Sequence, residues 1–394
     1  MRTLVFPLAT LRRACLPAAL ALLGALGCVK NSSGGTNLYV YDNTSRSVLV
    51  WNDVNKVYSA AKAGTTVPSA DRTIVNGLSS GEDLSWGGLA MDNTGNRIYL
   101  VETDGTVYVI NKANTQSGTV SKTADIISFT LGKSGVDPYT AGSVFGQAAV
   151  DGNSNILYVL ENAANGSATR VWKITNASQV GNSSTITPAS SYTIGVSTDT
   201  FGCGVAAIPG GNAYGLFGGG TTIYDGMGNN PRSGPRLRQG SGGTFPSPAS
   251  NDYSSGVVIG LATELVSPLQ YGSLAYDSQN SSLYVFAPNY SSPGNAAVLV
   301  FKSSAFSPGL DVAPTRSLGD TAGALGNLRA ISHPASGDWL LGANFSLTSS
   351  SAIGEGTGTS SLLIWDTPSG GSAAVSATLP GVSEIRGMAI GGNN

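Results

Sequence analysis

Residues 384–394 read EIRGMAIGGNN, and residues 86–111, far upstream, read WGGLAMDNTGNRIYLVETDGTVYVIN. Both stretches contain a glycine, an apolar residue, an alanine and a second apolar residue in succession. In residues 86–111 a polar turn and a run centred on Tyr99 follow at once, whereas residues 384–394 stop after the first run. A repeat that stops after its first element predicts that another part of the chain supplies the rest of it.

Six copies of this pattern can be marked by their alanines, which lie 55 to 68 residues apart. A polar turn, a short run with a central aromatic residue and a third apolar run follow each of the first five alanines. The third run of the third copy, which follows Ala207, is TTIYD, residues 221–225. Such runs, bounded by Gly, Asn, Asp and Ser, are typical of strands joined by tight turns. No segment keeps a helical apolar period over about three turns, so we expect almost no helix. The marker alanines are Ala90, Ala149, Ala207, Ala275, Ala330 and Ala389, and the central aromatic residues are Tyr99, Tyr158, Tyr214, Tyr284 and Trp339.

The missing part of the sixth copy lies near the other end of the chain. Residues 37–53, NLYVYDNTSRSVLVWND, contain one run around Tyr39 and another that ends at Trp51. One strand from residues 384–394 can therefore join three strands from residues 37–80, which is how a propeller closes its ring. A β-sandwich would not give nearly equal repeats with complementary ends, and an open solenoid would need atypical capping repeats. We predict an all-β fold, a six-bladed β-propeller of four-stranded blades.

The predicted propeller domain spans residues 37–394. The fourth blade has the longest step between marker alanines, so that either an additional hairpin or a long loop could lie within it. The predicted blade boundaries are 37–80 with 384–394 for the first blade, and about 83–131, 142–196, 197–260, 262–320 and 321–383 for the second to sixth.

Residues 1–27 have the layout of a secretory signal peptide, with three arginines and no acidic residue before 14 uncharged, mostly apolar residues. This apolar run is shorter than the about 20 residues that span a membrane. The stretch GALGC, ending at Cys28, resembles the lipobox of bacterial lipoproteins, in which the cysteine carries lipid. We therefore expect lipid on Cys28, a tether at residues 28–36 and export to the outer membrane, with plain signal cleavage as the alternative. The side of the membrane stays open.

The composition argues against several classes of partner. The 21 basic residues, less three in residues 1–27, leave 18 against 23 acidic residues, so the exported chain has a net charge of −5. This mild acidity argues against a surface that follows nucleic-acid phosphates. With Cys15 in the signal peptide and Cys28 lipidated, Cys203 is left alone, and no disulfide within the chain is expected.

Three segments resemble NHL-type propeller repeats of exported bacterial proteins. They are residues 71–102, DRTIVNGLSSGEDLSWGGLAMDNTGNRIYLVE, residues 315–332, TRSLGDTAGALGNLRAIS, and residues 46–53, RSVLVWND. In that family an Arg-containing outer strand leads through a turn into a Gly-apolar-Ala-apolar-Asp strand and then into an apolar-Tyr-Val strand. The resemblance implies a propeller fold and a binding role, and it implies no reaction.

No set of residues in the sequence predicts catalysis. His333 in SHPASG is the only histidine, and we expect it at the surface of a turn. Some six-bladed propellers are calcium-dependent lactonases or esterases that need several oxygen ligands at the ring axis. Only Glu384 and Asn327 fall near the axis, and Asp92, Asp151 and Asp277 recur as turn-forming residues. We expect no metal, no cofactor and no enzyme activity, and the calcium-dependent hydrolase is the alternative.

Large side chains recur four residues before the marker alanines, beside glycines, where the chain starts each inner strand. They could line an apolar funnel, with arginines supplying charge, or they could be wedges between blades. The candidate ligand-binding residues are Trp86, Phe145, Tyr271, Arg329 and Arg386. A second candidate contact is the basic segment NNPRSGPRLRQG, residues 229–240, which we expect to be a solvated loop.

The function expected from the sequence is a non-catalytic binding or scaffold lipoprotein at the bacterial cell envelope. The expected partner is an envelope protein or a glycan, and the chain is expected to be a monomer that touches the membrane only through its lipid.

Overall fold

The computed structural model describes the chain from residue 36 to residue 391, with gaps. The described residues are 36–79, 81–132, 144–162, 169–186, 201–218, 236–239, 257–259, 274–287, 297–306, 311–319, 325, 328–334, 337–347 and 358–391. The chain divides into Met1–Gly35 and Thr36–Asn394, and all of these residues belong to the second unit. Within the described part of the chain, no helix is long and apolar enough to cross a membrane.

The described strands form six sheets. The first sheet holds β26 (Ile385–Gly391), β1 (Asn37–Asp42), β2 (Ser47–Trp51), β3 (Arg72–Asn76) and β7 (Gly118–Val120). The second holds β4 (Leu84–Asp92), β5 (Arg97–Glu102), β6 (Thr106–Asn111), β8 (Ile126–Leu131) and β12 (Ser184–Ile186). The third holds β9 (Val144–Asp151), β10 (Ile156–Asn162) and β11 (Thr169–Thr175).

The other three sheets follow in chain order. The fourth holds β13 (Phe201–Ile208), β14 (Asn212–Gly218), β15 (Arg236–Gln239), β16 (Val257–Ile259) and β20 (Asp311–Val312). The fifth holds β17 (Leu274–Asp277), β18 (Ser282–Ala287), β19 (Ala297–Lys302) and β21 (Arg316–Leu318). The sixth holds β22 (Leu328–Ser332), β23 (Leu340–Leu347), β24 (Gly358–Trp365) and β25 (Val375–Ala377).

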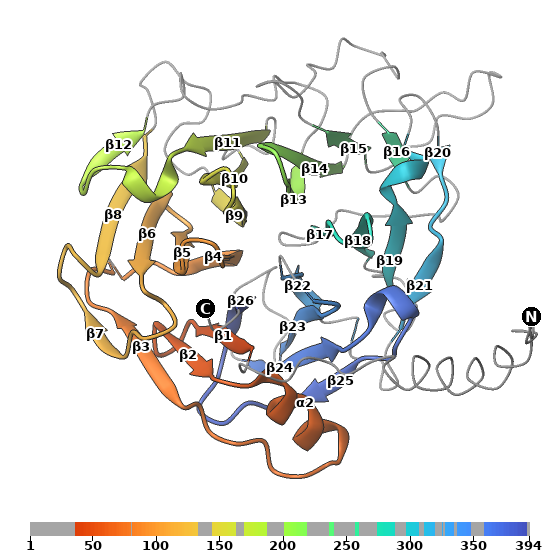
Figure 1. Cartoon of the computed structure of the whole chain (residues 1–394), viewed down its shortest axis with the longest axis horizontal. Helices are drawn as coiled ribbons and strands as arrows, with labels where there is room; N and C mark the ends of the chain where they lie inside the picture. The colour runs from red at the N-terminus through yellow and green to blue at the C-terminus, as the bar shows by residue number, and fades with distance from the viewer. Residues whose placement is uncertain are drawn as a thin grey trace, which may run out of the picture. The chain divides into compact units, whose positions relative to one another are not determined.

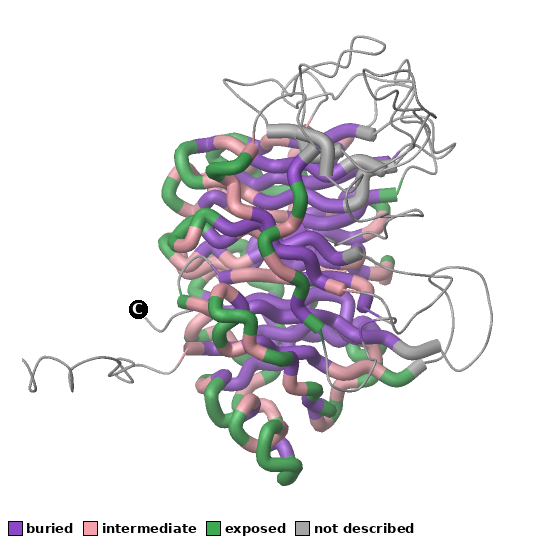
Figure 2. Tube along the Cα trace, turned by 90° about the vertical axis from the view of Figure 1, so that its right-hand side faces the viewer, coloured by how far each residue is buried: buried purple, intermediate pink, exposed green. Residues whose placement is uncertain are grey.

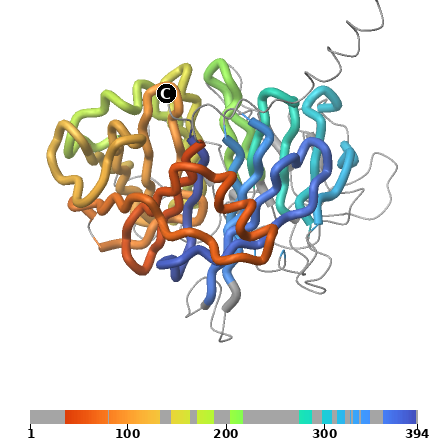
Figure 3. Tube along the Cα trace, turned by 60° about the horizontal axis from the view of Figure 1, so that its bottom comes forward, coloured from red at the N-terminus to blue at the C-terminus, as the bar shows by residue number. Residues whose placement is uncertain are grey.

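The sheets are arranged as a propeller around a central axis (Figure 1). The innermost strands contact one another in a closed circuit, in the order β26, β4, β9, β13, β17, β22 and back to β26. The predicted ring closure is confirmed, because β26 pairs antiparallel with β1, with Leu38 opposite Ile390 and Tyr39 opposite Ala389. The C-terminal strand and the N-terminal strand therefore lie side by side in one sheet (Figures 1 and 3).

Strand pairing explains why the alanine and the aromatic residue repeat together. Ala90 on β4 lies opposite Tyr99 on β5, and the same pairing recurs in three other sheets. A small residue fits where the inner strands converge on the axis, while the large ring is buried between neighbouring sheets. The other three pairs are Ala149 with Tyr158, Ala275 with Tyr284, and Ala389 with Tyr39.

The apolar core is divided among the spaces between neighbouring sheets. Six clusters of buried side chains are present among the described residues, and each joins two sheets that are adjacent in the ring. Leu38 and Val40 of β1 face the sixth sheet, whereas Tyr39 and Tyr41 face the second. This follows from the alternation of side chains along a strand. Buried residues run along the strands, and exposed ones gather at the turns (Figure 2).

The prediction of six four-stranded blades is wrong in its count. Five sheets have the four or more strands of a blade, and the sheet of β9, β10 and β11 has three. The reason is visible at its outer edge, where the next strand, β12, pairs in parallel with β8 of the second sheet instead. Residues 187–196, the rest of the predicted third blade, lie outside the described residues.

Short parallel strands extend three sheets at their outer edges, which the sequence did not predict. β7 pairs with β3, β12 with β8, and β20 with β16. In each case the strand comes from the part of the chain that belongs to the following sheet. Covering an outer edge in this way satisfies backbone groups that would otherwise be open to pairing with another chain.

The prediction of almost no helix is confirmed, with one α-helix among the described residues, and one loop prediction is corrected. A helix, α2 (Val54–Lys62), lies between β2 and β3. Asp53 caps its first turn, because the Asp53 side chain accepts a hydrogen bond from Asn55 N. Val54 and Val57 of this helix are buried. The strand paired with β14 in the fourth sheet is Arg236–Gln239, part of the predicted solvated loop. The predicted strand at residues 221–225 lies outside the described residues. Three short 3-10 helices complete the described elements: η1 (Ala177–Gln179), η5 (Ser303–Ala305) and η7 (Pro368–Gly370).

Candidate functional site

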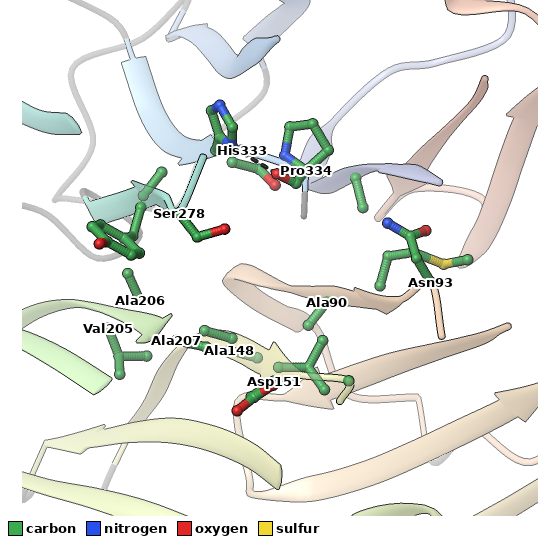
Figure 4. A pocket seen from close by; sticks show the side chains of 18 of the residues that line it. Ala90, Asn93, Ala148, Asp151, Val205, Ala206, Ala207, Ser278, His333 and Pro334 are labelled. Atoms are coloured by element: carbon green, nitrogen blue, oxygen red, sulfur yellow. Dashed lines mark hydrogen bonds between the residues drawn. The ribbon is translucent and has the colours of Figure 1, made fainter. Parts of the chain in front are cut away.

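A cavity of about 180 Å³ lies on the ring axis, at the end where the inner strands turn into the second strands (Figure 4). Its wall consists mainly of small side chains from β4, β9, β13, β17 and β26. Five of the six marker alanines line it, so the repeat seen in the sequence is also the lining of the cavity. They are Ala90, Ala149, Ala207, Ala275 and Ala389.

The side chain of Gln147 extends across the interior of the ring and forms part of the cavity wall. Its Nε2 donates to Leu274 O at 2.6 Å and to Ile331 O at 3.4 Å, and its Oε1 accepts from Val205 N at 3.1 Å. These bonds join β9 to β13, β17 and β22, and the residue is only 5% exposed. A fully bonded amide in this position ties four sheets together at the axis.

The mouth of the cavity is lined by turns whose aspartates bond to backbone N–H groups, as the sequence predicted for Asp92, Asp151 and Asp277. Asp92 Oδ1 accepts from Gly95 N at 2.8 Å within its own turn. Asp151 Oδ2 accepts from Gly210 N at 3.0 Å and from Gly211 N at 2.8 Å, which belong to the next sheet. The recurring aspartates therefore shape the turns, and Asp151 also links neighbouring sheets.

His333 is buried beside this cavity, and the prediction of a surface position is wrong. Its side chain is 1% exposed, and its ring stacks on Tyr284 with centroids 5.5 Å apart and an interplanar angle of 12°. Its Nδ1 lies 2.7 Å from Pro334 O, and its Nε2 lies 3.7 Å from Asp277 Oδ2. The ring lies at the junction of the fifth and sixth sheets, and this packing covers it.

Asp338 completes a cluster with Asp277 and His333. One ligand atom from each of the three lies within 4.8 Å of the others, and within the described ranges this is the group of such side chains that could hold a metal ion. Burial lowers the pKa of the His333 imidazole, and the Asp277 carboxylate and the Pro334 carbonyl act in the opposite direction. Burial also raises the pKa of the Tyr284 hydroxyl, and the carboxylates of Asp277 and Asp338 raise it further.

A repeat-to-repeat comparison of the sequence could have found this cluster. Asp277 follows its marker alanine, Ala275, by two positions, and His333 follows Ala330 by three. Equivalent turns of consecutive repeats are neighbours around a ring, so a titratable pair at these positions is a signal of contact. Asp338 lies five residues beyond His333 in the same connection.

The other end of the inner strands holds Trp86 and Arg386, which the structure brings together. The guanidinium of Arg386 lies 5.1 Å from the centre of the Trp86 ring, and that ring lies 5.8 Å from the ring of Phe345. Arg386 Nε donates to Glu384 Oε1 at 2.6 Å, and Nη2 lies 2.9 Å from Asp83 Oδ2. The arginine is thus paired with two carboxylates, so it is not a free positive charge.

Two of the remaining candidates are described, each at the start of an inner strand, β9 or β22. Phe145 is 1% exposed and packs between the second and third sheets, with its ring 6.4 Å from that of Trp172. Arg329 is half-buried on β22. Cys28, Tyr271 and Asn327 lie outside the described residues, as does Arg232 of the basic segment. Glu384, considered as a calcium ligand, is bonded to Arg386 and to Asn43 Nδ2 at 3.2 Å.

No family model matches this sequence, and no curated protein sequence matches it. Among solved structures, TolB from Acinetobacter baumannii aligns with a TM-score of 0.42 and 11% identity, over 94% of this chain and 69% of that chain. Kuenenia stuttgartiensis hydrazine synthase aligns with a TM-score of 0.39 and 11% identity, over 78% of this chain and 71% of that chain. The Cps50 (Swd1) β-propeller domain from Myceliophteria thermophila aligns with a TM-score of 0.37 and 9% identity, over 79% of this chain and 94% of that chain. At these identities and scores the similarity identifies no shared activity or ligand.

Proposed function

We propose that this chain is a non-catalytic binding or scaffold protein of the bacterial cell envelope, and that it receives its ligand in the axial cavity. The observation that carries this proposal is the cavity itself, with a wall of alanines and a rim of polar turns. Ligand sites commonly combine apolar side chains with polar groups at defined places, and this cavity contains both. The propeller fold is consistent with a binding or scaffold role.

The size of the cavity indicates what kind of ligand would enter it. Its volume of about 180 Å³ is below the about 300 Å³ at which sites for whole small molecules begin. It suits the terminal group of a larger partner, such as one side chain of an envelope protein or one sugar unit of a glycan. The rest of such a partner would lie over the turns at the rim, which include Asn93, Asp151 and Ser278.

Filling the cavity tests the proposal. Ala207→Leu places a larger side chain at a half-buried position of the wall, and Ala305→Leu makes the same change at an exposed position outside it. We expect the wild type and Ala305→Leu to bind at least one member of an array of envelope glycans and purified envelope proteins, and Ala207→Leu to lose that binding while keeping its melting temperature. Binding that survives in Ala207→Leu would exclude the cavity as the site.

Trp86 and Arg386 remain a proposed second contact, with Arg329 on a neighbouring inner strand. Trp86 is half-buried at the opposite end of the ring and lies against Arg386 and Phe345. Testing Trp86→Leu in the same array distinguishes binding at the axial cavity from binding at the end of the ring that holds Trp86. A loss of binding in Trp86→Leu, with binding retained in Ala207→Leu, would move the ligand to the end with Trp86.

We also propose that the protein is a lipoprotein of the outer membrane anchored through Cys28, after removal of residues 1–27. The tether from Val29 to Thr36 would reach at most about 26–29 Å when fully extended. The propeller would therefore stay close to the bilayer, which favours an envelope partner. Wild-type protein expressed in bacteria with labelled palmitate should carry label and fractionate with membranes, and Cys28→Ser should do neither. An unlabelled, soluble wild type would contradict the lipid anchor.

We also propose that the blades of this propeller are of the NHL type. The resemblance of residues 71–102, 315–332 and 46–53 to NHL repeats supports this proposal.

A further inference from the structure

The cluster of Asp277, His333 and Asp338 joins two turns that are distant in the sequence. Asp277 ends β17 of the fifth sheet, and His333 and Asp338 lie in the connection between β22 and β23 of the sixth sheet. Their ligand atoms lie within 4.8 Å of one another. A single bound ion would therefore connect two neighbouring sheets beside the ring axis.

The hydrogen bond at Nδ1 determines which nitrogen of His333 is available. Pro334 O, 2.7 Å away, is a carbonyl and can only accept, so Nδ1 carries the proton. In the neutral imidazole, Nε2 then has a lone pair. Nε2 is buried, has no hydrogen-bond partner among the described residues, and lies 3.7 Å from Asp277 Oδ2. Two electron-pair donors thus face each other, which is unfavourable unless a cation or a proton lies between them.

The surroundings of the cluster hold each side chain in the orientation of a ligand. A metal-binding histidine commonly donates its other N–H to a backbone carbonyl or a carboxylate, as Nδ1 of His333 does. Asp277 Oδ1 accepts from Gln279 N at 2.9 Å and from Asn280 N at 3.0 Å. Asp338 Oδ1 accepts from Ser369 N at 3.1 Å, and Ser369 Oγ donates to Oδ2. Asp277 Oδ1 uses both of its lone pairs in these bonds. Among the described residues, Asp277 Oδ2 accepts only from Asn280 Nδ2, at 2.7 Å, so it keeps a second lone pair for an ion, as does each oxygen of Asp338.

We propose that Asp277, His333 and Asp338 bind one divalent transition-metal cation, of the zinc or manganese type. One imidazole nitrogen and two carboxylate oxygens suit these metals, which accept nitrogen and oxygen donors together. Calcium and magnesium are bound by oxygen ligands and would gain little from the imidazole. The metal would tie the fifth sheet to the sixth, and this proposal does not depend on the ligand of the axial cavity.

The single histidine of the chain makes the test direct. The full chain, purified without a polyhistidine tag and treated with chelator, is titrated with zinc chloride and with manganese chloride. We expect one equivalent of zinc to bind and to raise the melting temperature. With isotope-labelled histidine, the NMR signal of Nε2 should move on zinc binding, while Nδ1 keeps its proton. A structural role without metal would produce neither change.

Variants assign the ligands. His333→Gln and Asp338→Asn should each bind zinc at least tenfold more weakly than the wild type. Asp366→Asn, a carboxylate-to-amide change directly after β24 and outside the cluster, should bind as the wild type does. If one variant fails to fold, the other and the NMR shift still decide the matter. The proposal would be overturned if the wild type binds no metal, or if all three variants bind zinc with equal affinity. It would also be overturned if NMR shows that both nitrogens of His333 stay protonated, as an imidazolium paired with the carboxylates, when zinc is added.

Discussion

Gly387 provides a stringent test of how the ring closes. It lies in the C-terminal strand β26, opposite Tyr41 of β1, and faces β4 of the second sheet. A Cβ at this position would lie 2.5 Å from Leu89 Cβ, 3.0 Å from Leu84 Cδ2 and 3.1 Å from Leu89 N. Because Leu89 Cβ and N are fixed to the backbone of β4, the innermost strand of its sheet, the strand itself would have to move. Gly387→Ala therefore tests the contact between the closing strand and the neighbouring sheet.

The size of the effect follows from two opposing terms. Overpacking a well-packed interior costs about 1–3 kcal/mol. Replacing glycine by alanine also restricts the unfolded chain, which stabilises by about 0.4–1 kcal/mol where the backbone conformation permits alanine. The backbone of Gly387 does not have a positive φ, so alanine suffers no conformational strain there. We expect Gly387→Ala to lower the free energy of unfolding by about 1–2 kcal/mol.

Gly319→Ala is the matched control, because nothing lies within 4 Å of a Cβ at that exposed position. It should stabilise the protein by about 0.4–1 kcal/mol, so the two substitutions should have effects of opposite sign. Urea unfolding followed by tryptophan fluorescence measures the free energy of unfolding of both variants. Equal denaturant slopes in the two variants and the wild type would show that the same surface is exposed on unfolding. A Gly387→Ala protein as stable as Gly319→Ala would show that β26 does not pack against β4, and the closed ring would be wrong.

Two further predictions concern the whole propeller. Deleting residues 384–394 removes β26, including the buried Ile385, Met388 and Ile390, and exposes the edge of β1. The truncated chain should therefore unfold at a lower temperature or aggregate. An unchanged melting temperature would contradict the closure of the ring by β26. Burial raises the pKa of Tyr41 and Tyr99 and raises that of Tyr214 to about 12. The folded state holds these protons to a higher pH than the unfolded chain does. The stability that the neutral tyrosines contribute is therefore complete below about pH 10. It is lost as the pH rises through the folded-state pKa values. Urea unfolding at increasing alkaline pH should show falling stability, whereas a flat profile up to pH 12 would contradict the burial of these rings.

The sequence alone determined the features that depend on local periodicity and turn chemistry. The alternation of apolar residues in runs such as residues 37–42 places successive side chains in opposite inter-sheet spaces. In three repeats the marker alanine and the central tyrosine face each other across a hairpin only a few residues long. The aspartates bond to N–H groups of their own turns. The incomplete repeats at the two ends of the chain predicted the pairing of β26 with β1, because in a closed ring each incomplete repeat can be completed only by the other.

Only the tertiary structure decided what lies between sheets. His333 reads as an exposed turn residue by itself, but the turn of the preceding repeat brings Asp277 to it and Tyr284 covers its ring. Trp86 and Arg386 stand in different repeats, so their contact, like the pairing of Arg386 with Asp83, depends on how the first and second sheets pack. The parallel strands at the outer edges, which left the third sheet with three described strands, depend on which edge lies nearest to a connecting segment. Such contacts join residues that no local period relates, so the physical information that specifies them arises only once the sheets are packed around the axis.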